Sequence, residues 1–109
     1  MPRTLLQRRL IDVSDRLKRL RAELSVAEEQ CAFFEAEAED ARLRSLVSET
    51  PVADAEAREV RRHADAQTRQ RDALRRAVHE LEAEQDALLD LMEAEIDVRA
   101  VASDAGSLR

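Results

Sequence analysis

The sequence predicts an all-α fold, an antiparallel two-helix coiled-coil hairpin that assembles into a dimeric or higher helical bundle. Three observations support this fold class. The chain has 109 residues with 39% charged and 2% aromatic side chains, one Gly and two Pro, a composition typical of long helices and coiled coils. Apolar residues recur at heptad spacing on both sides of one short central break. The charges form blocks whose signs match when the chain folds back on itself.

The first helix is expected over residues 4–47, after a disordered N-terminus at residues 1–3. Thr4 with Gln7 fits a capping box, in which each side chain bonds the other's free backbone amide. Apolar residues then alternate by four and three positions, which is the spacing of a coiled-coil seam. These positions are Leu6, Leu10, Val13, Leu17, Leu20, Leu24, Ala27, Cys31, Phe34, Ala38 and Ala41.

A bend is expected at residues 48–51. Proline lacks a backbone N–H and disfavours helical dihedral angles in the residue before it. Thr50 can serve as the N-cap of a second helix, with Pro51 at its first position. Acidic side chains lie close to the bend in the sequence. The predicted hairpin tip therefore consists of Glu49, Thr50, Pro51, Asp54 and Glu56.

The second helix is expected over residues 51–100, followed by a flexible tail at residues 101–109. Its seam contains three polar residues among eleven positions. Polar groups in a seam cost stability but can fix register and partner number. The seam positions are Ala57, Val60, Ala64, Gln67, Arg71, Leu74, Val78, Leu81, Gln85, Leu88 and Met92.

The charge distribution predicts antiparallel pairing. Residues 3–21 carry net +5 and residues 22–40 net −7, whereas residues 58–76 carry net +4 and residues 77–97 net −8. A fold near residue 50 places residues i and j side by side where i+j is about 100, so opposite charges meet. A parallel dimer would place each block against itself. A continuous helix through Pro51 that dimerises antiparallel would make the same block pairings, and domain swapping would interconvert the two forms.

Additional apolar residues predict a contact surface. A two-helix hairpin buries only one stripe per helix, so further burial is expected where the apolar residues broaden, at the open end of the hairpin. Phe33, on the flank of the first seam, is a second contact candidate, although the two Phe rings could also fill space opposite alanines. The candidate partner or oligomer surface is Leu5, Ile11, Phe33, Leu89, Leu91, Ile96 and Val98.

No residue pattern predicts catalysis. Cys31 lies on the seam, where a free cysteine packs as a small hydrophobe. His63 and His79 are separated by ~24 Å along one helix, too far to share a metal ion. Gly106 is the only glycine, so no phosphate-binding loop exists. The sequence therefore predicts a protein that is not an enzyme, with no catalytic residue, metal site, cofactor or small-molecule substrate.

The remaining sequence features predict a cytoplasmic location. No stretch approaches the ~20 apolar residues of a membrane span. A single cysteine gives no internal disulfide and fits a reducing compartment. The net charge of −6 argues against general phosphate binding. Membrane binding is thus not expected, and nucleic acid is an unlikely partner on charge alone.

These features together predict a coiled-coil adaptor or scaffold that forms homo-oligomers and binds an unidentified larger protein. A long hairpin with an acidic tip is also similar in shape to factors that enter the secondary channel of RNA polymerase, where tip acids act on the catalytic metal. That analogy of architecture implies an alternative, a regulator of a macromolecular machine that acts through the tip. A further alternative is weak nucleic-acid binding through the arginine-rich stretch from Arg58 to Arg76.

Overall fold

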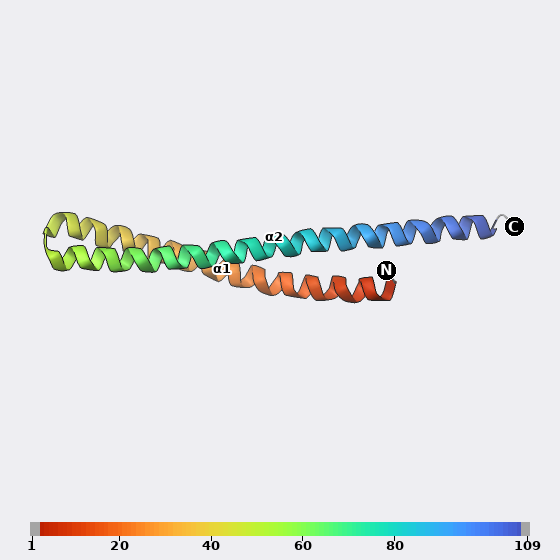
Figure 1. Cartoon of the computed structure of the whole chain (residues 1–109), viewed down its shortest axis with the longest axis horizontal. Helices are drawn as coiled ribbons and strands as arrows, with labels where there is room; N and C mark the ends of the chain where they lie inside the picture. Colours follow the sequence, from red (N-terminus) through yellow and green to blue (C-terminus); the bar gives the residue numbers. More distant parts are fainter. Residues whose placement is uncertain (1–2, 108–109) are drawn as a thin grey trace. The chain divides into compact units, whose positions relative to one another are not determined.

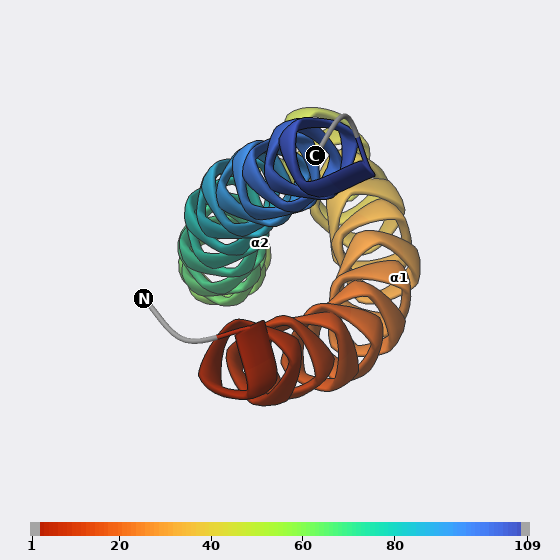
Figure 2. The same cartoon turned by 90° about the vertical axis from the view of Figure 1, so that its right-hand side faces the viewer.

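The computed structural model describes residues 3–107, which form two long α-helices and no β-strand. Helix α1 comprises Arg3–Ser48, and helix α2 comprises Pro51–Ser107. Both helices continue without interruption over these ranges (Figures 1 and 2). The helices run antiparallel on either side of a two-residue connection. The predicted all-α hairpin is thus confirmed as the fold of the chain.

The two helices contribute to two compact units. The tip unit is the stretch Leu20–Ala77, which contains the connection and the adjoining halves of both helices. The open-end unit joins the described part of α1 up to Arg19 with α2 from Val78 onward. Within each unit, a segment of α1 packs against an antiparallel segment of α2. Each unit therefore has its own part of the seam.

The connection between the helices has capped ends. Glu49 adopts a left-handed backbone conformation with φ of 51°, and its N–H donates to the Ser45 carbonyl at 3.0 Å, which is the αL motif that ends many helices. Thr50 caps α2 as predicted, because its hydroxyl accepts a hydrogen bond from the Ala53 N–H at 3.2 Å. The helix does not continue through Pro51, since these two residues break it.

The helix ends differ from the predicted ones. Helix α1 already includes Arg3, so Thr4 lies inside the helix and does not serve as its N-cap. Helix α2 continues to Ser107, whereas a flexible tail was expected from residue 101. The residues after 100 include no proline, and Gly106 is the only strong helix breaker among them. The outermost parts of the two predicted ends, residues 1–2 and 108–109, lie outside the described residues.

The core follows the heptad positions of both helices. Every predicted seam residue of α1 is buried or half-buried, as is every predicted seam residue of α2. The side chains of Leu6, Val13 and Leu17 are each 1% exposed, and they are the largest fully buried side chains. Alanines line much of the tip unit. The buried apolar set is Leu6, Val13, Leu17, Ala27, Cys31, Ala38, Ala41, Ala64, Val78, Leu81 and Leu88.

The polar seam positions are accommodated at the edge of the core. Gln85 donates from Nε2 to the Ser14 hydroxyl at 3.1 Å. The half-buried Arg71 pairs with the neighbouring Asp72, with 3.1 Å between Nη2 and Oδ1. Among the described side chains, no buried polar atom lacks a hydrogen-bond partner. These residues therefore occupy the seam without the cost of an unsatisfied buried group.

Contacts between the helices give the antiparallel register. In the open-end unit, Arg9 pairs with Glu84 at 2.8 Å. In the tip unit, Glu35 pairs with Arg61, and Arg44 with Glu56. In each of these three pairs, and in the hydrogen bond between Ser14 and Gln85, the two residue numbers sum to between 93 and 100. This is close to the sum of about 100 predicted from the charge blocks. All three ion pairs join opposite charges across the two helices.

Candidate functional site

The open-end unit exposes large apolar side chains on both helices. On α2, Leu89 is 43% exposed, Leu91 49%, Ile96 50% and Val98 67%. On α1, the predicted contact residues Leu5 and Ile11 are also exposed. Isolated exposed apolar residues are common on protein surfaces. Four of them lie within ten residues of one helix, and such a local density of exposed apolar side chains favours an interaction site.

The α2 residues form two rows, one on each side of the seam. Leu89 and Ile96 are seven residues apart and follow the seam positions Leu88 and Glu95 by one residue. Leu91 and Val98 are also seven residues apart, and they precede their nearest seam positions by one residue. Because one residue corresponds to a rotation of ~100°, the two rows lie on opposite flanks of the seam. We name them the Leu89 flank and the Leu91 flank.

The Arg9–Glu84 ion pair shows which α1 residues lie near the Leu91 flank. Glu84 precedes Leu91 by seven residues and therefore lies on the same flank of α2. Arg9 reaches across the seam to this flank. Leu5, one turn before Arg9, lies on the same side of α1. Ile11 lies elsewhere on α1, because six residues from Leu5 correspond to a rotation of ~240°. The structure thus does not bring Leu5 and Ile11 into one patch.

The C-terminal part of α2 extends past the first described turn of α1 (Figure 1). The register of the cross-helix pairs in this unit places Arg3 beside residues 90–96 of α2. Val98 and Val101 lie beyond this range and are 67% and 69% exposed. No described turn of α1 lies next to them. An apolar partner for these two side chains must therefore come from outside the described residues.

The tip unit contains the two phenylalanines. Phe34 occupies its predicted seam position and stacks on His63 of α2, with ring centroids 6.3 Å apart and an interplanar angle of 17°. Phe33 makes an edge-to-face contact with Phe34 at 5.4 Å and is 61% exposed. Phe33 therefore has one edge on the hairpin and most of its surface open to a partner.

The acidic residues of the tip are largely engaged with α1. The Ser45 hydroxyl donates a hydrogen bond to the carboxylate of Asp54. Glu56 accepts from Arg44 at 3.3 Å. The third predicted tip acid is Glu49. Its only described interaction is the backbone hydrogen bond that ends α1. The tip therefore presents two carboxylates that hold the helices together.

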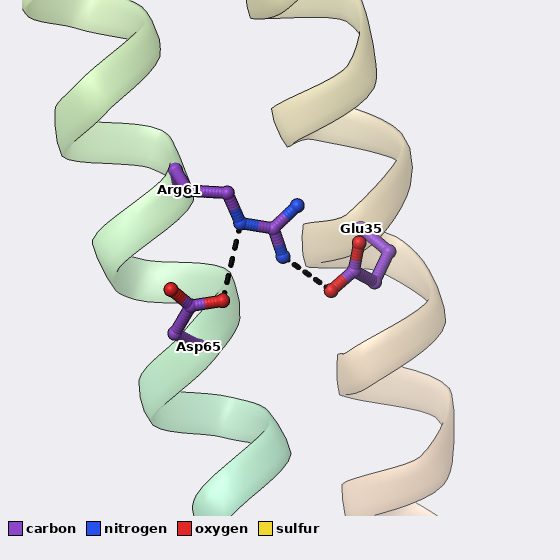
Figure 3. Close-up of polar contacts among 3 residues, drawn as sticks. All are labelled: Glu35, Arg61 and Asp65. Atoms are coloured by element: carbon purple, nitrogen blue, oxygen red, sulfur yellow. Dashed lines mark hydrogen bonds and ion pairs between the residues drawn. The ribbon is translucent and has the colours of Figure 1, made fainter.

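A charged cluster bridges the helices of the tip unit. Figure 3 shows Arg61 of α2 between Asp65 on its own helix and Glu35 on α1. The hydrogen bond that Arg61 donates to Glu35 raises the pKa of Arg61. Nearby on α1, the hydrogen bond from Arg42 lowers the pKa of Glu39. The cluster thus joins opposite charges on the two helices, although each exposed pair adds little stability.

The arginine-rich stretch is divided between paired and unpaired side chains. Arg61, Arg62 and Arg71 each pair with a carboxylate. Arg58, with Arg61 and Arg62, lines an open hollow of about 470 Å³ whose floor is alanine. In the part of the chain that the structure describes, no ion pair involves Arg58, Arg69, Arg75 or Arg76. The stretch thus neutralises part of the acidic block of α1 and leaves several cations exposed.

The comparisons with known proteins assign no family. The chain matches no protein-family model, and neither a curated protein nor a solved structure is significantly similar to it. Function must therefore be inferred from the chemistry and geometry of the surface.

The residues considered for chemistry show no clustered site. Cys31 is buried at its seam position. His79 lies 3.6 Å from Glu82 on the same helix and far along α2 from His63. No group of three metal-ligating side chains occurs among residues 3–107. Within the same range, no helix is both long enough and apolar enough to span a membrane.

Sequence reasoning missed several exposed apolar residues. Val101 was assigned to the tail, yet it follows Ala94 by seven residues on the continuing helix. Its spacing from Ala94 and Val98 is the signal that could have placed it. Other exposed apolar residues lie on α1 away from its seam positions, or beside the connection. They are Val26, Leu43, Leu46, Val47 and Val52.

Proposed function

We propose that this protein is a non-enzymatic coiled-coil adaptor that self-associates and binds a larger protein. The observation that carries the proposal is the pair of exposed apolar flanks on α2 in the open-end unit. Leu89 and Ile96 lie on one flank, and Leu91 and Val98 on the other. A helix that buries one seam against α1 and exposes apolar residues on both sides of that seam is suited to contact further helices.

The energetic argument favours use of this surface. Full burial of a Leu, Ile or Val side chain contributes ~1.5–3 kcal/mol. The four flank residues are between 43% and 67% exposed, so burial of the remaining surface would contribute several kcal/mol. A fold of two helices has few other sources of tertiary stabilisation. Association through these flanks would therefore stabilise the helices as well as recruit a partner.

The two alternative functions have less support. A role of the tip in a macromolecular machine would use its carboxylates, and those of Asp54 and Glu56, although exposed, are already bonded to α1. Nucleic-acid binding requires a positive surface, and three arginines of the stretch from Arg58 to Arg76 are already paired with carboxylates, one of them on α1. Both alternatives make testable statements: alanine at Glu49, Asp54 and Glu56 would abolish a tip function, and retention on DNA or RNA would depend steeply on salt.

The proposal is tested by the absolute mass of the purified protein, measured by light scattering across a concentration series. A dimer or larger species is expected at the upper concentrations. A well-folded monomer of 12.4 kDa at every concentration would contradict self-association. Circular dichroism on the same samples shows whether the helices are formed, so that a monomer is not confused with an unfolded chain.

A further inference from the structure

The Leu91 flank belongs to a second heptad stripe. Apolar residues recur on α2 at Ala87, Leu91, Ala94, Val98 and Val101, again by four and three positions. All five are exposed. Each residue precedes a position of the seam register by one residue, so this outer stripe lies ~100° around α2 from the seam. A corner helix of a four-helix bundle packs on two neighbours through two stripes placed in this way.

The outer stripe has an acidic border. Asp90, Asp97 and Asp104 each precede one position of the stripe or of its continuation, again at seven-residue spacing. In coiled coils, such flanking positions select the partner by charge. A helix that packs on the outer stripe must therefore present small or apolar residues with basic residues beside them. Two outer stripes cannot pair with each other, because their aspartates would meet.

The tip unit presents this complement on α2. Ala66, Gln70, Ala73 and Ala77 continue the same heptad positions, and Arg62, Arg69 and Arg76 occupy the flanking positions that the aspartates occupy in the outer stripe. Arg69 and Arg76 are exposed, as are Asp90 and Asp97. None of these four residues takes part in an ion pair in the described structure.

We infer that the outer stripe binds the stretch Ala66–Ala77 of a second copy of this chain, in an antiparallel α2–α2 contact that occurs twice about a two-fold axis. This inference rests on the proposed self-association and specifies its surface and register. Arg76 then faces Asp90 of the second copy, and Arg69 faces Asp97. In both pairs the residue numbers are equally far from 83, as two-fold symmetry requires.

The apolar layers fit the same register. In an antiparallel coiled coil, the flanking pairs fix which stripe positions oppose each other. Here Ala73 opposes Leu91, and Ala66 opposes Val98, so that a small residue meets a large one in these two layers, whereas Ala77 opposes Ala87. A small-to-large alternation lets two helices approach closely and fill the space between them. The exposed leucine and valine of the outer stripe are thereby covered.

The layer next to the two-fold axis is acidic. Glu80 of one copy opposes Glu84 of the other, and both positions occur twice. Glu84 is paired with Arg9 in its own chain at 2.8 Å, which offsets part of its charge. Glu80 has no such partner among the described residues. The register therefore makes a second statement that can be tested: removal of the Glu80 charge should tighten the dimer.

The test exchanges the charges of one predicted pair, Arg69 and Asp97. The dissociation constant of the dimer is then measured by light scattering or sedimentation equilibrium. Arg69→Asp and Asp97→Arg each place like charges opposite one another twice per dimer. We expect each single variant to dimerise at least about tenfold more weakly than the unmodified protein. The double variant restores opposite charges and should regain most of the affinity. Asp86→Arg is the matched control, because it reverses a charge on α2 outside the stripe and should not weaken the dimer.

The outcomes separate this inference from the proposed function. If the unmodified protein is a folded monomer, both fail. Alternatively, the protein self-associates while the single variants dimerise as tightly as the unmodified protein, or while the double variant fails to regain affinity. Either result overturns the register and leaves self-association standing. Glu80→Ala should lower the dissociation constant, and an unchanged or higher value would also overturn the register. Circular dichroism confirms that each variant keeps its helical content.

Discussion

The two apolar flanks of α2 are expected to differ in what they bind. We predict that Leu91→Glu combined with Val98→Glu abolishes dimerisation, whereas Leu89→Glu combined with Ile96→Glu leaves it nearly intact. Both double variants add two negative charges to the same helix. The replaced side chains are exposed to comparable extents, 49% and 67% on one flank against 43% and 50% on the other. Each variant is thus a matched control for the other.

The expected magnitude follows from the exposed fractions. Full burial of a Leu or Val contributes ~1.5–3 kcal/mol. Since about half of Leu91 and about a third of Val98 are already covered and the opposing residues are small, we take about 2 kcal/mol for the two side chains together. Two-fold symmetry doubles this loss of binding free energy to about 4 kcal/mol per dimer, which corresponds to a roughly 1,000-fold larger dissociation constant.

The assay is sedimentation equilibrium across a concentration series, with helical content measured on the same samples. Dimerisation that survives Leu91→Glu with Val98→Glu would refute the assignment of this flank to self-association. An equally large loss from Leu89→Glu with Ile96→Glu would show that association uses both flanks without a specific register. A loss of helical content in either variant would instead indicate that the substitutions disturb the fold.

Three further predictions concern the tip unit. Thr50→Ala removes the cap of α2 and should lower the free energy of unfolding by about 1 kcal/mol in urea denaturation, and an unchanged value would show that the cap is not stabilising. Glu49→Gly should raise the free energy of unfolding by ~0.5 kcal/mol, because glycine adopts the left-handed conformation without steric cost. A lower free energy of unfolding would contradict this account. Arg42→Gln should raise the pKa of Glu39 toward its ordinary value of 4.5, as followed by carbon NMR. Since the fold lowers this pKa, the stabilisation by Glu39 is present above the ordinary value and is lost as the pH falls through the lowered pKa.

Much of the fold could be predicted from the sequence because one physical requirement repeats along both helices. Burial of a single stripe imposes heptad spacing on the apolar residues, and the charge blocks then allow only an antiparallel register. The position of the connection followed from Pro51, which cannot continue a helix without loss of a hydrogen bond. These signals act over many residues or through one strong constraint, so they indicate the fold reliably.

The helix ends and the polar contacts were harder to predict. Beyond residue 100, each residue changes helix stability by less than about 1 kcal/mol, too little to locate an end before Ser107. The partner of Gln85 depends on register and rotamer, so Ser14 carries no signal of its own in the sequence. The same holds at the tip, where nothing in the sequence indicates that the exposed Asp54 accepts a bond from Ser45.

Self-association and partner binding need not compete on this helix. The outer stripe turns toward a second copy, which leaves Leu89 and Ile96 on the opposite flank of the seam. Two-fold symmetry would place one such free flank on each side of the axis, because each copy contributes one open-end unit. A partner protein would then be bound twice by one dimer, and linked binding of this kind raises the apparent affinity for a multivalent target. Loss of dimerisation through Leu91→Glu with Val98→Glu should therefore weaken binding to a multivalent partner and spare binding to a monovalent one.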